Sequence, residues 1–417
     1  MMGVGEVNSR PTPLYKTMAK YTLRDYQQKA SDAAVNMFLN KRRFQKNALL
    51  VLPTGAGKSL VISDIAARID APLLVFNPSK EILEQNVSKF QSYGIWDYGV
   101  YSASVGKKDI NRVTFATIKS VYNHKEDFAH FKYILIDECH QVNSLSGQYK
   151  DFIESGERVV IGLTATPYRL DKGQNGAPML KFLTRTRPRI FQCLLYYCQV
   201  NELLVRGYLS KLMYYDLTGR TAFDVTKVQL NSTGAEFDEK SMRMELERSG
   251  FADELPRWVT RIINPKKGAP RRGVLVFTQF VKESEHLKRQ LCAKGISCDV
   301  VSADTPKAER ERIIADFKAG RIRVVANAAT LTTGFDYPEL DTVVMARATM
   351  SLSLWYQIVG RAIRPFPGKV GWIVDLCGNI QRFGHVEDLR IECEAPNSGR
   401  WCIMSRGRQL TNVLMTR

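Results

Sequence analysis

The sequence has few cysteines, no long apolar run and no apolar leader at its amino terminus. None of its 8 cysteines forms a C-x₂-C pair, so their spacing indicates neither a zinc site nor a disulfide framework. No apolar run approaches the roughly 18 residues of a membrane span, and residues 1–19 lack the apolar centre of a signal peptide. These absences predict a protein with reduced cysteines that works in the cytoplasm, without a membrane partner.

Positive charge is in excess. The chain has 60 Lys and Arg against 42 Asp and Glu, a formal net charge of +18, which predicts a polyanionic partner. We expect nucleic acid rather than a membrane, because no basic amphipathic helix stands out. At 417 residues, of which 44% are hydrophobic, the chain is long enough for two globular domains.

The stretch at 48–66 predicts a phosphate-binding site. An apolar strand at 48–52 is followed by PTGAGKS at 53–59 and then by apolar residues at helical spacing. Glycines let backbone N–H groups surround the phosphates, a lysine reaches the terminal phosphates, and a serine ligates Mg²⁺. Leu52 stands where such loops usually have their first glycine. The residues predicted to bind the nucleotide here are Thr54, Gly55, Ala56, Gly57, Lys58 and Ser59.

Two adjacent carboxylates follow another predicted strand. Residues 133–136 are apolar and run into the sequence DECH. Carboxylates at the end of a buried strand cost free energy unless they bind something. After a phosphate loop, this pattern predicts that Asp137 holds Mg²⁺ opposite Ser59 and that Glu138 polarises the attacking water. His140 is expected to connect this site to the rest of the protein.

A helix is predicted immediately before the phosphate loop, over residues 21–39. Arg24 and Gln27 lie three residues apart on one of its faces. A glutamine amide has one donor and one acceptor, which match the N6/N7 edge of adenine. Because this helix directly precedes the loop, we expect both residues to bind the adenine.

Two junctions between a strand and a helix carry further polar residues. Lys80 follows a predicted strand at 72–76, and Thr117 follows one at 112–116. The carboxyl ends of parallel strands meet at one edge of a sheet, where open α/β folds bind ligands. Both residues are therefore expected at the nucleic-acid interface, and ordinary helix capping remains an open alternative.

The next predicted strand, at 159–163, ends in Thr164 and Thr166. These hydroxyls are expected beside the predicted site. The following segment, 170–200, is expected to be irregular and basic. Three arginines in it precede several aromatic residues: Arg185, Arg187 and Arg189. They either contact nucleic acid or form a basic loop over a core, and the sequence leaves both interpretations open.

The second half of the chain again alternates strands with helices. Strands are predicted at 273–278, 298–301, 322–326 and 342–346. This alternation predicts a second parallel sheet, yet the second half has no phosphate loop of its own. Arg361 and Arg364 are three residues apart, so they point to one side of a predicted helix. Two converging arginines suit an anionic transition state, and a basic helix face is the alternative.

The motifs together resemble those of a known family. In chain order they are LRDYQ, PTGAGKS, DECH, TATP, VFTQF, TTGFDYP and QIVGRAIR. Their order is similar to that of superfamily 2 helicases of the DEAD/DEAH-like groups, and most similar to RadD-like bacterial and phage DNA helicases. The resemblance covers residues 20–380. It implies an α/β fold of two tandem RecA-like domains, each a parallel sheet flanked by helices, with ATP in the cleft.

The resemblance also implies roles for individual residues. ATP and Mg²⁺ would be the cofactors, and Lys58, Asp137 and Glu138 would act in hydrolysis. Gly334 and Asp336 would approach the ATP ribose, whereas Arg361 and Arg364 would be the arginine fingers. Residues assigned to coupling hydrolysis with movement are His140, Thr164, Thr166 and Gln357. Residues assigned to nucleic acid are Lys80, Thr117 and Thr278.

The implied domain organisation has four parts. Residues 1–19 are a disordered lead, 20–205 the ATP-binding domain, 206–380 the second helicase domain, and 381–417 a short basic tail that could hold a small hairpin. RadD-like proteins continue into a cysteine-rich zinc-binding region. Here Cys393 and Cys402 have no C-x₂-C partners, so a role carried by that region is not expected of this chain.

The expected function is an ATP-dependent DNA helicase or translocase in repair, recombination or replication. Its expected partner is single-stranded or branched DNA, in a bacterial cytoplasm or in the host cytoplasm if the protein is phage-encoded. Two alternatives remain. An ATP-dependent RNA helicase would have a similar motor core, and nothing in the sequence clearly reads a 2′-hydroxyl. A nucleic-acid-binding scaffold without motor activity would have lost its catalytic Lys, Glu or Arg, and all three are present.

Overall fold

The computed structural model describes residues 21–40, 47–172, 178–266, 268–328, 330–331 and 335–414. The chain divides into two compact units. One comprises Met1–Leu50 and Gly57–Leu163, and the other comprises Val51–Ala56 and Thr164–Arg417. The predicted Gly334 lies outside the described residues, as do the predicted lead at 1–19 and the last three residues of the tail.

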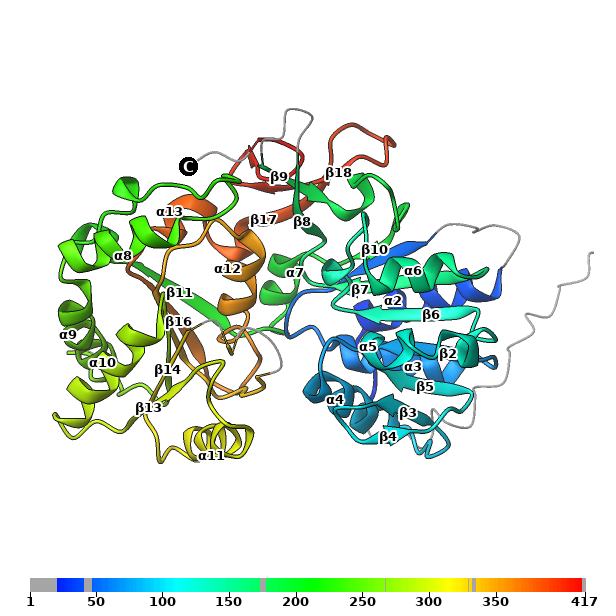
Figure 1. Ribbon diagram of the computed structural model, residues 1–417, viewed down its shortest axis with the longest axis horizontal. Helices are drawn as coiled ribbons and strands as arrows, with labels where there is room; N and C mark the ends of the chain where they lie inside the picture. Colours follow the sequence, from blue (N-terminus) through cyan, green and yellow to red (C-terminus); the bar gives the residue numbers. More distant parts are fainter. Residues whose placement is uncertain are drawn as a thin grey trace, which may run out of the picture. The chain divides into compact units, whose positions relative to one another are not determined.

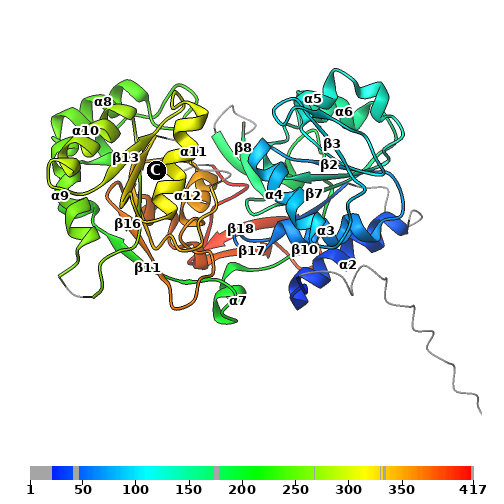
Figure 2. The ribbon, with the colours of Figure 1, turned by 90° about the horizontal axis from the view of Figure 1, so that it is seen from below.

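A parallel sheet forms the centre of the first unit (Figures 1 and 2). Its strands follow the spatial order β1-β7-β6-β2-β5-β3-β4, and only β4 pairs antiparallel, with β3. Their bounds are β1 Ala48–Val51, β2 Leu73–Phe76, β3 Gly99–Ser102, β4 Lys107–Lys108, β5 Val113–Ala116, β6 Tyr133–Asp137 and β7 Val159–Thr164. Strands β1, β2, β5 and β6 are buried throughout, as expected of parallel strands covered on both faces.

Helices flank this sheet on both sides. Figure 2 shows α2 and α3 on one side of the strands and α5 and α6 on the other. The helices are α2 Asp25–Leu39, α3 Lys58–Arg68, α4 Lys80–Gln91, α5 Ile118–Tyr122 and α6 Gln148–Glu154, with short 3₁₀ turns at Lys125–Phe128 and Cys139–Gln141. The alternation expected from the sequence is therefore confirmed in this unit, and each predicted strand lies within one residue of its observed place.

The second unit contains a six-stranded parallel sheet in the order β11-β16-β15-β12-β14-β13. The strands are β11 Lys211–Asp216, β12 Val274–Thr278, β13 Cys298–Val301, β14 Val324–Asn327, β15 Thr342–Ala346 and β16 Val370–Asp375. Its helices are α7 Val200–Val205, α8 Glu239–Arg248, α9 Phe251–Ile263, α10 Val281–Cys292, α11 Lys307–Lys318, α12 Leu352–Val359 and α13 Asn379–Phe383. Short 3₁₀ turns lie at Leu183–Arg185, Thr218–Arg220, Val225–Lys227 and Val386–Asp388.

The core of the second unit lies where α8, α9 and α10 pack on the sheet (Figure 1). Leu255 and Val259 of α9, Leu287 of α10 and Val276 of β12 are all fully buried. These apolar positions of α9 recur every three to four residues, which gives the helix one apolar face. Burial of that face holds the helical layer on the sheet.

The segment that was expected to be irregular, 170–200, contains three strands. Strands β8 (Tyr168–Lys172) and β9 (Pro178–Phe182) form an antiparallel hairpin, and β10 (Cys193–Tyr197) follows. The expectation was wrong because charged residues interrupt β8 and β9, and because β10 is only a short run of Cys, Leu and Tyr, so none of the three strands shows a clear period. All three strands lie in the second unit, whereas the sequence places the domain boundary at 205. That boundary stays a prediction.

The tail contains a three-stranded antiparallel sheet, β17-β18-β19. Strand β18 (Trp401–Ser405) and β19 (Arg408–Gln409) form a hairpin where the sequence suggested one, and β17 (Leu389–Cys393) adds a third strand. The part of the chain that the structure describes contains no helix long and apolar enough to cross a membrane.

One side chain joins this small sheet to β9. Asn412 Oδ1 accepts the backbone N–H of Phe182 at 3.0 Å. Its amide group donates to Glu394 Oε1 at 3.0 Å and to the carbonyl of Trp401 at 2.9 Å. Asn412 also has φ +62°, a left-handed conformation that asparagine tolerates better than other non-glycine residues. The tail is thus an integral part of the second unit.

We expect Asn412→Ala to lower the free energy of unfolding of the second unit by about 2–3 kcal/mol, since each of three lost hydrogen bonds contributes about 1 kcal/mol net. Urea denaturation followed by circular dichroism measures this change. The matched control is Asn123→Ala, because Asn123 is exposed and its replacement should change stability by less than about 0.5 kcal/mol. Equal stability of the two variants would contradict the structural role of Asn412.

Candidate nucleotide-binding and hydrolysis site

The predicted phosphate loop lies between β1 and α3. Gly55 and Gly57 have φ of +82° and +80°, values that residues with a Cβ rarely adopt. Helix α3 begins at Lys58 without a side-chain cap. Its first N–H groups and the positive end of its dipole are therefore available to an anion. This local geometry fits a polyphosphate, which is the ligand that the sequence predicted.

Gln27 lies directly against this loop. A Cβ added at Gly57 would be 2.5 Å from Gln27 Nε2, so any larger residue there would displace the amide. Gln27 is 4% exposed, and its Oε1 accepts the backbone N–H of Arg24 at 2.8 Å. The structure thus brings Gln27 to the edge of the phosphate loop, and Arg24 is joined to it through its backbone N–H.

A buried polar network fixes the position of the helix that carries Gln27. Ser31 of α2 donates to Asp64 of α3 at 2.5 Å. Arg68 of α3 contacts Asp64 at 3.1 Å and Asp32 of α2 at 2.6 Å. Asp64 is 1% exposed, so this pairing compensates a charge that would otherwise be costly to bury. The sequence analysis did not identify these residues, since four polar positions on two helices carry no distinctive motif.

The two predicted carboxylates lie at the end of β6. Asp137 is 3% exposed, and its Oδ1 accepts the backbone N–H of Glu138 at 2.9 Å. Glu138 has φ +50°, a strained conformation that is found more often at functional sites. Lys58 Nζ lies 3.2 Å from Glu138 Oε1, and His140 Nδ1 lies 3.3 Å from Glu138 Oε2. Four predicted site residues therefore meet within the first unit.

The two carboxyl groups have opposite pKa shifts. Burial and the neighbouring charge of Glu138 raise the pKa of Asp137 to about 6. Burial alone would also raise the pKa of Glu138, but Lys58 and His140 outweigh it and lower that pKa to about 2. Glu138 is therefore ionised at neutral pH, whereas Asp137 feels the charge of Lys58 only at longer range and forms no ion pair among the described residues.

An amide network supports Asp137. Asn86 Nδ2 donates to Asp137 Oδ2 at 3.1 Å and to Asn77 Oδ1 at 2.7 Å. Asn77 in turn donates to the carbonyl of Val75 at 2.9 Å. Asn86 Oδ1 is buried and has no hydrogen-bond partner among the described residues. These asparagines were missed by sequence reasoning, although Asn77 directly follows a predicted strand.

These residues fit a hydrated Mg²⁺ ion. A carboxylate without an ion pair among the described residues, a serine hydroxyl in the phosphate loop and an unpaired amide oxygen are oxygen donors of the kind that Mg²⁺ and its water shell accept. The donors are Asp137, Ser59 and Asn86. Among the described residues, no group of three or more His, Cys, Asp or Glu side chains forms a protein-only metal cage. A Mg²⁺ bound here would therefore depend on nucleotide phosphates for further ligands.

The two threonines of TATP lie at the start of the second unit. Both are buried, and the backbone N–H of Thr166 donates to Thr164 Oγ1 at 3.0 Å. The carbonyl of Thr164 accepts the N–H of Leu52 at 3.0 Å, directly before the phosphate loop. This bond joins the TATP segment to the backbone that leads into the phosphate loop, and the coupling role of both threonines stays a prediction.

The predicted arginine fingers belong to the second unit and differ in environment. Arg361 is 6% exposed and donates to the carbonyl of Phe335 at 2.7 Å. Arg364 forms an ion pair with Asp336. Residues Val51–Ala56 belong to the same unit, and a Cβ at Gly55 would lie 3.7 Å from Arg364 Cα. Of the two arginines, Arg364 is thus the one beside the phosphate-loop backbone.

The remaining predicted coupling residue, Gln357, lies on α12 and is partly buried. Its helix is followed by Gly360, where an added Cβ would lie 2.8 Å from Thr54 Cγ2. Thr54 is a predicted nucleotide-binding residue, and Gly360 is therefore required for this close approach. Ala56, also predicted, is buried within the same loop.

Two of the predicted nucleic-acid residues line one groove of the first unit. Lys80 and Thr117 both border a groove of about 690 Å³ at the ends of β2 and β5. Lys80 is the first residue of α4, whose N-cap is Ser79. Thr117 is the N-cap residue of α5, and its side chain makes no capping hydrogen bond. Other polar residues lining this groove are Lys119, Ser120, Gln141, Asn143 and Gln148.

The third predicted nucleic-acid residue, Thr278, is in the interior. It is fully buried, and its hydroxyl is 2.7 Å from Ser284 Oγ and 3.0 Å from the carbonyl of Phe280. These bonds position the turn between β12 and α10. The structure therefore does not present the Thr278 side chain to a surface where a nucleic-acid strand could touch it.

Comparisons with known proteins identify two conserved domains. The family described as "Type III restriction enzyme, res subunit" matches residues 20–169, and the "Helicase conserved C-terminal domain" family matches residues 254–365. These two ranges contain the phosphate loop, the carboxylates and both arginines.

Several curated relatives resemble most of the chain. The "51.5 kDa protein" of a Lactococcus phage is 25% identical over 80% of this chain and 66% of that protein. "Putative ATP-dependent helicase IRC3" of Saccharomyces cerevisiae is 24% identical over 82% of this chain and 49% of that protein. "DNA 3'-5' translocase XPB2" of Sulfurisphaera tokodaii is 24% identical over 86% of this chain and 82% of that protein. The chain thus spans about two thirds of the first of these relatives and half of the second.

Two solved structures share the fold. The "ATP-dependent Type ISP restriction-modification enzyme LlaBIII bound to DNA" has a TM-score of 0.60 at 19% identity and covers 85% of this chain and 28% of that one. A fragment of a putative HsdR subunit of a type I restriction enzyme from Vibrio vulnificus has a TM-score of 0.63 at 21% identity. It covers 89% of this chain and 67% of that one. At these identities the likeness shows the fold alone.

The two parallel-sheet units and the phosphate loop define the class of the protein as a P-loop enzyme with two α/β domains. More narrowly, its two matched domain families and its relatives make the chain similar to the superfamily 2 helicases. The closer resemblance to RadD-like helicases stays a prediction.

The raised pKa of Asp137 makes the stability of the protein depend on pH. Its folded-state pKa of about 6 lies above the ordinary value of 3.8, so its contribution to stability is present below pH 3.8 and is lost as the pH rises to 6. In a buffer with EDTA, we expect Asp137→Asn to be more stable than the unsubstituted protein at pH 7.5, by an amount on the order of 2 kcal/mol.

Urea denaturation at pH 5.0 and pH 7.5 measures this difference, which should be smaller at pH 5.0. Asp109→Asn is the matched control, because Asp109 is exposed in the same unit. If the Asp137→Asn protein is less stable than the unsubstituted protein at pH 7.5, the conclusion that burial raises the pKa of Asp137 would be contradicted.

Proposed function

We propose that the protein is an ATP-driven motor that translocates along DNA or unwinds it. The observation that carries this proposal is the cluster of Lys58, Asp137 and Glu138 beside a phosphate loop. A site that only bound a nucleotide would not require a second, strained carboxylate with a lowered pKa next to the phosphate-binding lysine.

The proposed hydrolysis uses a change of partner by Lys58. When bound, ATP with Mg²⁺ supplies the γ-phosphate that water attacks and the cation that neutralises its charge. Lys58 would leave Glu138 to contact the phosphates. Because burial raises the pKa of Glu138 and Lys58 lowers it, this departure makes Glu138 a stronger base. His140, which is 3.3 Å away, keeps the carboxylate in position to accept a proton from water.

The second unit is proposed to complete the site. Arg364 would contribute positive charge to the transferred phosphate, and its pairing with Asp336 holds the guanidinium until a stronger anion is present. Arg361, anchored on the carbonyl of Phe335, would support the helix end from which Arg364 projects. Repeated binding and hydrolysis would then alternate the contacts of the two units, which is the basis of movement along a strand.

DNA is the proposed track. The groove bordered by Lys80 and Thr117 offers hydroxyl, amide and ammonium groups, which suit a sugar–phosphate backbone. The relatives named as DNA-acting, including the translocase of Sulfurisphaera tokodaii, match over most of this chain. The match to a "Probable ATP-dependent RNA helicase DDX52" of Bos taurus covers 17% of it. A role in repair, recombination or replication belongs to the same proposal, as does work in the cytoplasm.

We expect Lys58→Ala to abolish ATP hydrolysis and to weaken ATP binding, since it removes the cation on the phosphates. Glu138→Gln should still bind ATP while its turnover falls by about 100-fold or more, because general-base catalysis is lost. Phosphate release and a fluorescent-nucleotide titration separate the two effects. Lys108→Ala and Glu126→Gln, both at exposed positions of the same unit, are the controls. Near-normal turnover in Glu138→Gln would refute the assignment.

Arg364→Ala should bind ATP normally but hydrolyse it about 1,000-fold more slowly, as expected when an arginine finger is removed. The same two assays measure it. Arg289→Ala, at an exposed position of the second unit, is the control and should retain full turnover. If Arg364→Ala lost ATP binding and turnover in equal proportion, the residue would act in binding and not in the transition state.

Stimulation of the ATPase activity tests whether the motor acts on DNA or on RNA. Single-stranded DNA, forked duplex DNA and RNA of the same sequence are compared at equal nucleotide concentration. We expect stimulation by DNA. Stimulation by RNA alone would favour the RNA helicase alternative, whereas binding without any stimulation would favour the scaffold.

A further inference from the structure

A pocket of about 400 Å³ in the second unit is lined largely by arginines. We call it the arginine pocket. It lies between the segment that follows β9 and the loop that precedes β18. Its lining residues are Thr184, Arg185, Arg187, Arg189, Gln192, Ser398, Gly399 and Arg400. These residues belong to neither of the conserved families' matched ranges, and none of them has a role in the proposed hydrolysis.

The two walls of the arginine pocket are tied together. Arg185 forms an ion pair with Glu394 at 2.9 Å, and Glu394 also accepts from Asn412, which bonds to β9. The side chain of Gln199 donates to the carbonyl of Ile391 at 2.9 Å and accepts its N–H at 3.1 Å. The pocket is therefore held by contacts that join the tail sheet to the rest of its unit.

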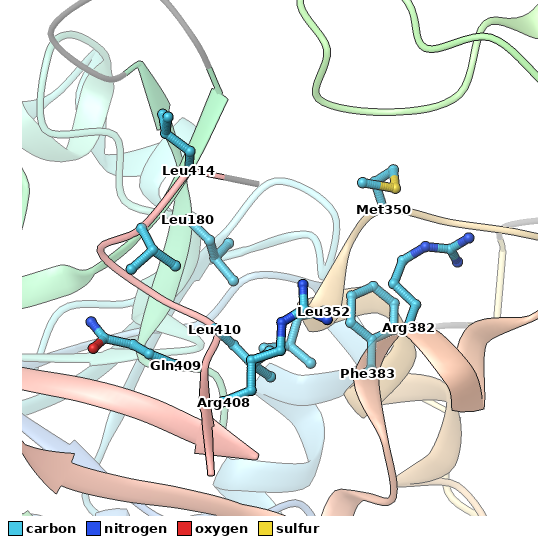
Figure 3. Close-up of a pocket in the computed structure, with 10 residues that line it drawn as sticks. Leu180, Met350, Leu352, Arg382, Phe383, Arg408, Gln409, Leu410 and Leu414 are labelled. Atoms are coloured by element: carbon cyan, nitrogen blue, oxygen red, sulfur yellow. The ribbon is translucent and has the colours of Figure 1, made fainter. Parts of the chain in front are cut away.

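The neighbouring pocket at the same junction has a different character. Figure 3 shows Leu180 of β9, Leu410 and Leu414 of the tail, and Phe383 of α13 around a space of about 250 Å³. Mainly apolar side chains line it, with Arg382 and Arg408 at its side. Apolar side chains of β9, α13 and the tail therefore face one another there, so the arginines are not the only contact of the tail with its unit.

Positive charge in the arginine pocket is only partly compensated. Of its four arginines, Arg185 alone has a carboxylate within ion-pair distance among the described residues. Arg187 donates to the carbonyl of Thr186 at 3.0 Å. Burial, followed by the charges of Arg187 and Arg185, lowers the pKa of Arg189. The guanidinium groups thus repel one another, and an anion between them would relieve that repulsion.

A buried hydroxyl group also lines the pocket. Thr184 is 3% exposed, and its Oγ1 has no hydrogen-bond partner among the described residues. A buried hydroxyl without a partner costs about 1–3 kcal/mol. An acceptor oxygen of a ligand in the pocket would satisfy it. This feature is independent of the arginines and indicates the same kind of ligand.

We infer that the arginine pocket binds the sugar–phosphate backbone of the nucleic acid on which the motor acts. Arginine forks bind phosphate oxygens in pairs, and the Thr184, Ser398 and Gln192 side chains provide further polar contacts. No aromatic or large apolar side chain lines the pocket, so it offers no surface on which a base would stack. The recognised group is therefore phosphate in a chain, read without regard to sequence. This inference rests on the proposed function.

The experiment compares two triple variants of the full chain. One is Arg187→Ala, Arg189→Ala and Arg400→Ala, and the control is Arg220→Ala, Arg257→Ala and Arg289→Ala. The control residues are exposed in the same unit and outside the pocket, so both variants lose the same formal charge. The dissociation constant for labelled single-stranded DNA is measured from 50 to 300 mM KCl, together with ATP hydrolysis in the absence of DNA.

We expect the pocket variant to bind DNA about 10–100-fold more weakly at 100 mM KCl. Its plot of log affinity against log salt should be shallower by about two, because each phosphate contact with single-stranded DNA contributes about 0.7 to the slope and three contacts are lost. The control should keep the original slope, and both should keep the DNA-free ATPase rate. Replacing the same pocket arginines with lysine should restore most of the slope, which separates lost charge from a folding defect.

Equal slopes for the pocket variant, the control and the unsubstituted protein would overturn the inference while leaving the proposed function intact. If the pocket variant binds ATP more weakly while its plot of log DNA affinity against log salt keeps the original slope, the pocket binds a free nucleotide. That result would also overturn the inference. If the unsubstituted protein binds neither DNA nor RNA, the proposed function fails, and the inference fails with it.

Discussion

The site is organised by the free-energy cost of placing two carboxylates at the buried end of β6. Asp137 and Glu138 are adjacent in the chain, and both are largely removed from water. One cation, Lys58, lies within ion-pair distance of Glu138. Without it, burial would raise the pKa of both groups, and the pair would take up a proton. The phosphate loop therefore has two roles: it forms a binding site, and its Lys58 supplies the positive charge that keeps the carboxylates ionised.

The same condition links ligand binding to chemistry. A lysine has one charge, so phosphates and Glu138 compete for it. In the proposed hydrolysis, Glu138 would lose its compensating cation when phosphates are bound, and Asp137 would be the carboxylate that holds Mg²⁺. The electrostatic environments of the two carboxyl groups would then be exchanged. A base that becomes stronger only when its substrate is present is consistent with the low pKa that Lys58 imposes on Glu138 before binding.

Sequence reasoning recovered the parts of this arrangement that depend on local patterns. The glycines of the loop, the DECH tetrapeptide and the apolar strands each have a short-range signature, and all lie where they were predicted. The Asn77–Asn86–Asp137 network has no such signature, because its members are brought together only by the pairing of β2 with β6. Thr278 shows the opposite error: a motif suggested contact with nucleic acid, whereas its burial makes it a structural residue.

The second unit contains the regions where local patterns were least informative. Segment 170–200 and the tail contain short strands with mixed polarity. Their strands pair largely with near neighbours, and the two regions are joined by contacts between residues far apart in the chain. Asn412 satisfies the N–H of Phe182 across 230 residues of sequence, and Arg185 pairs with Glu394 across 209. The arginine pocket is a consequence of this pairing. Its charge was visible in the sequence, but Arg400 joins the other three only because the tail folds back on β9.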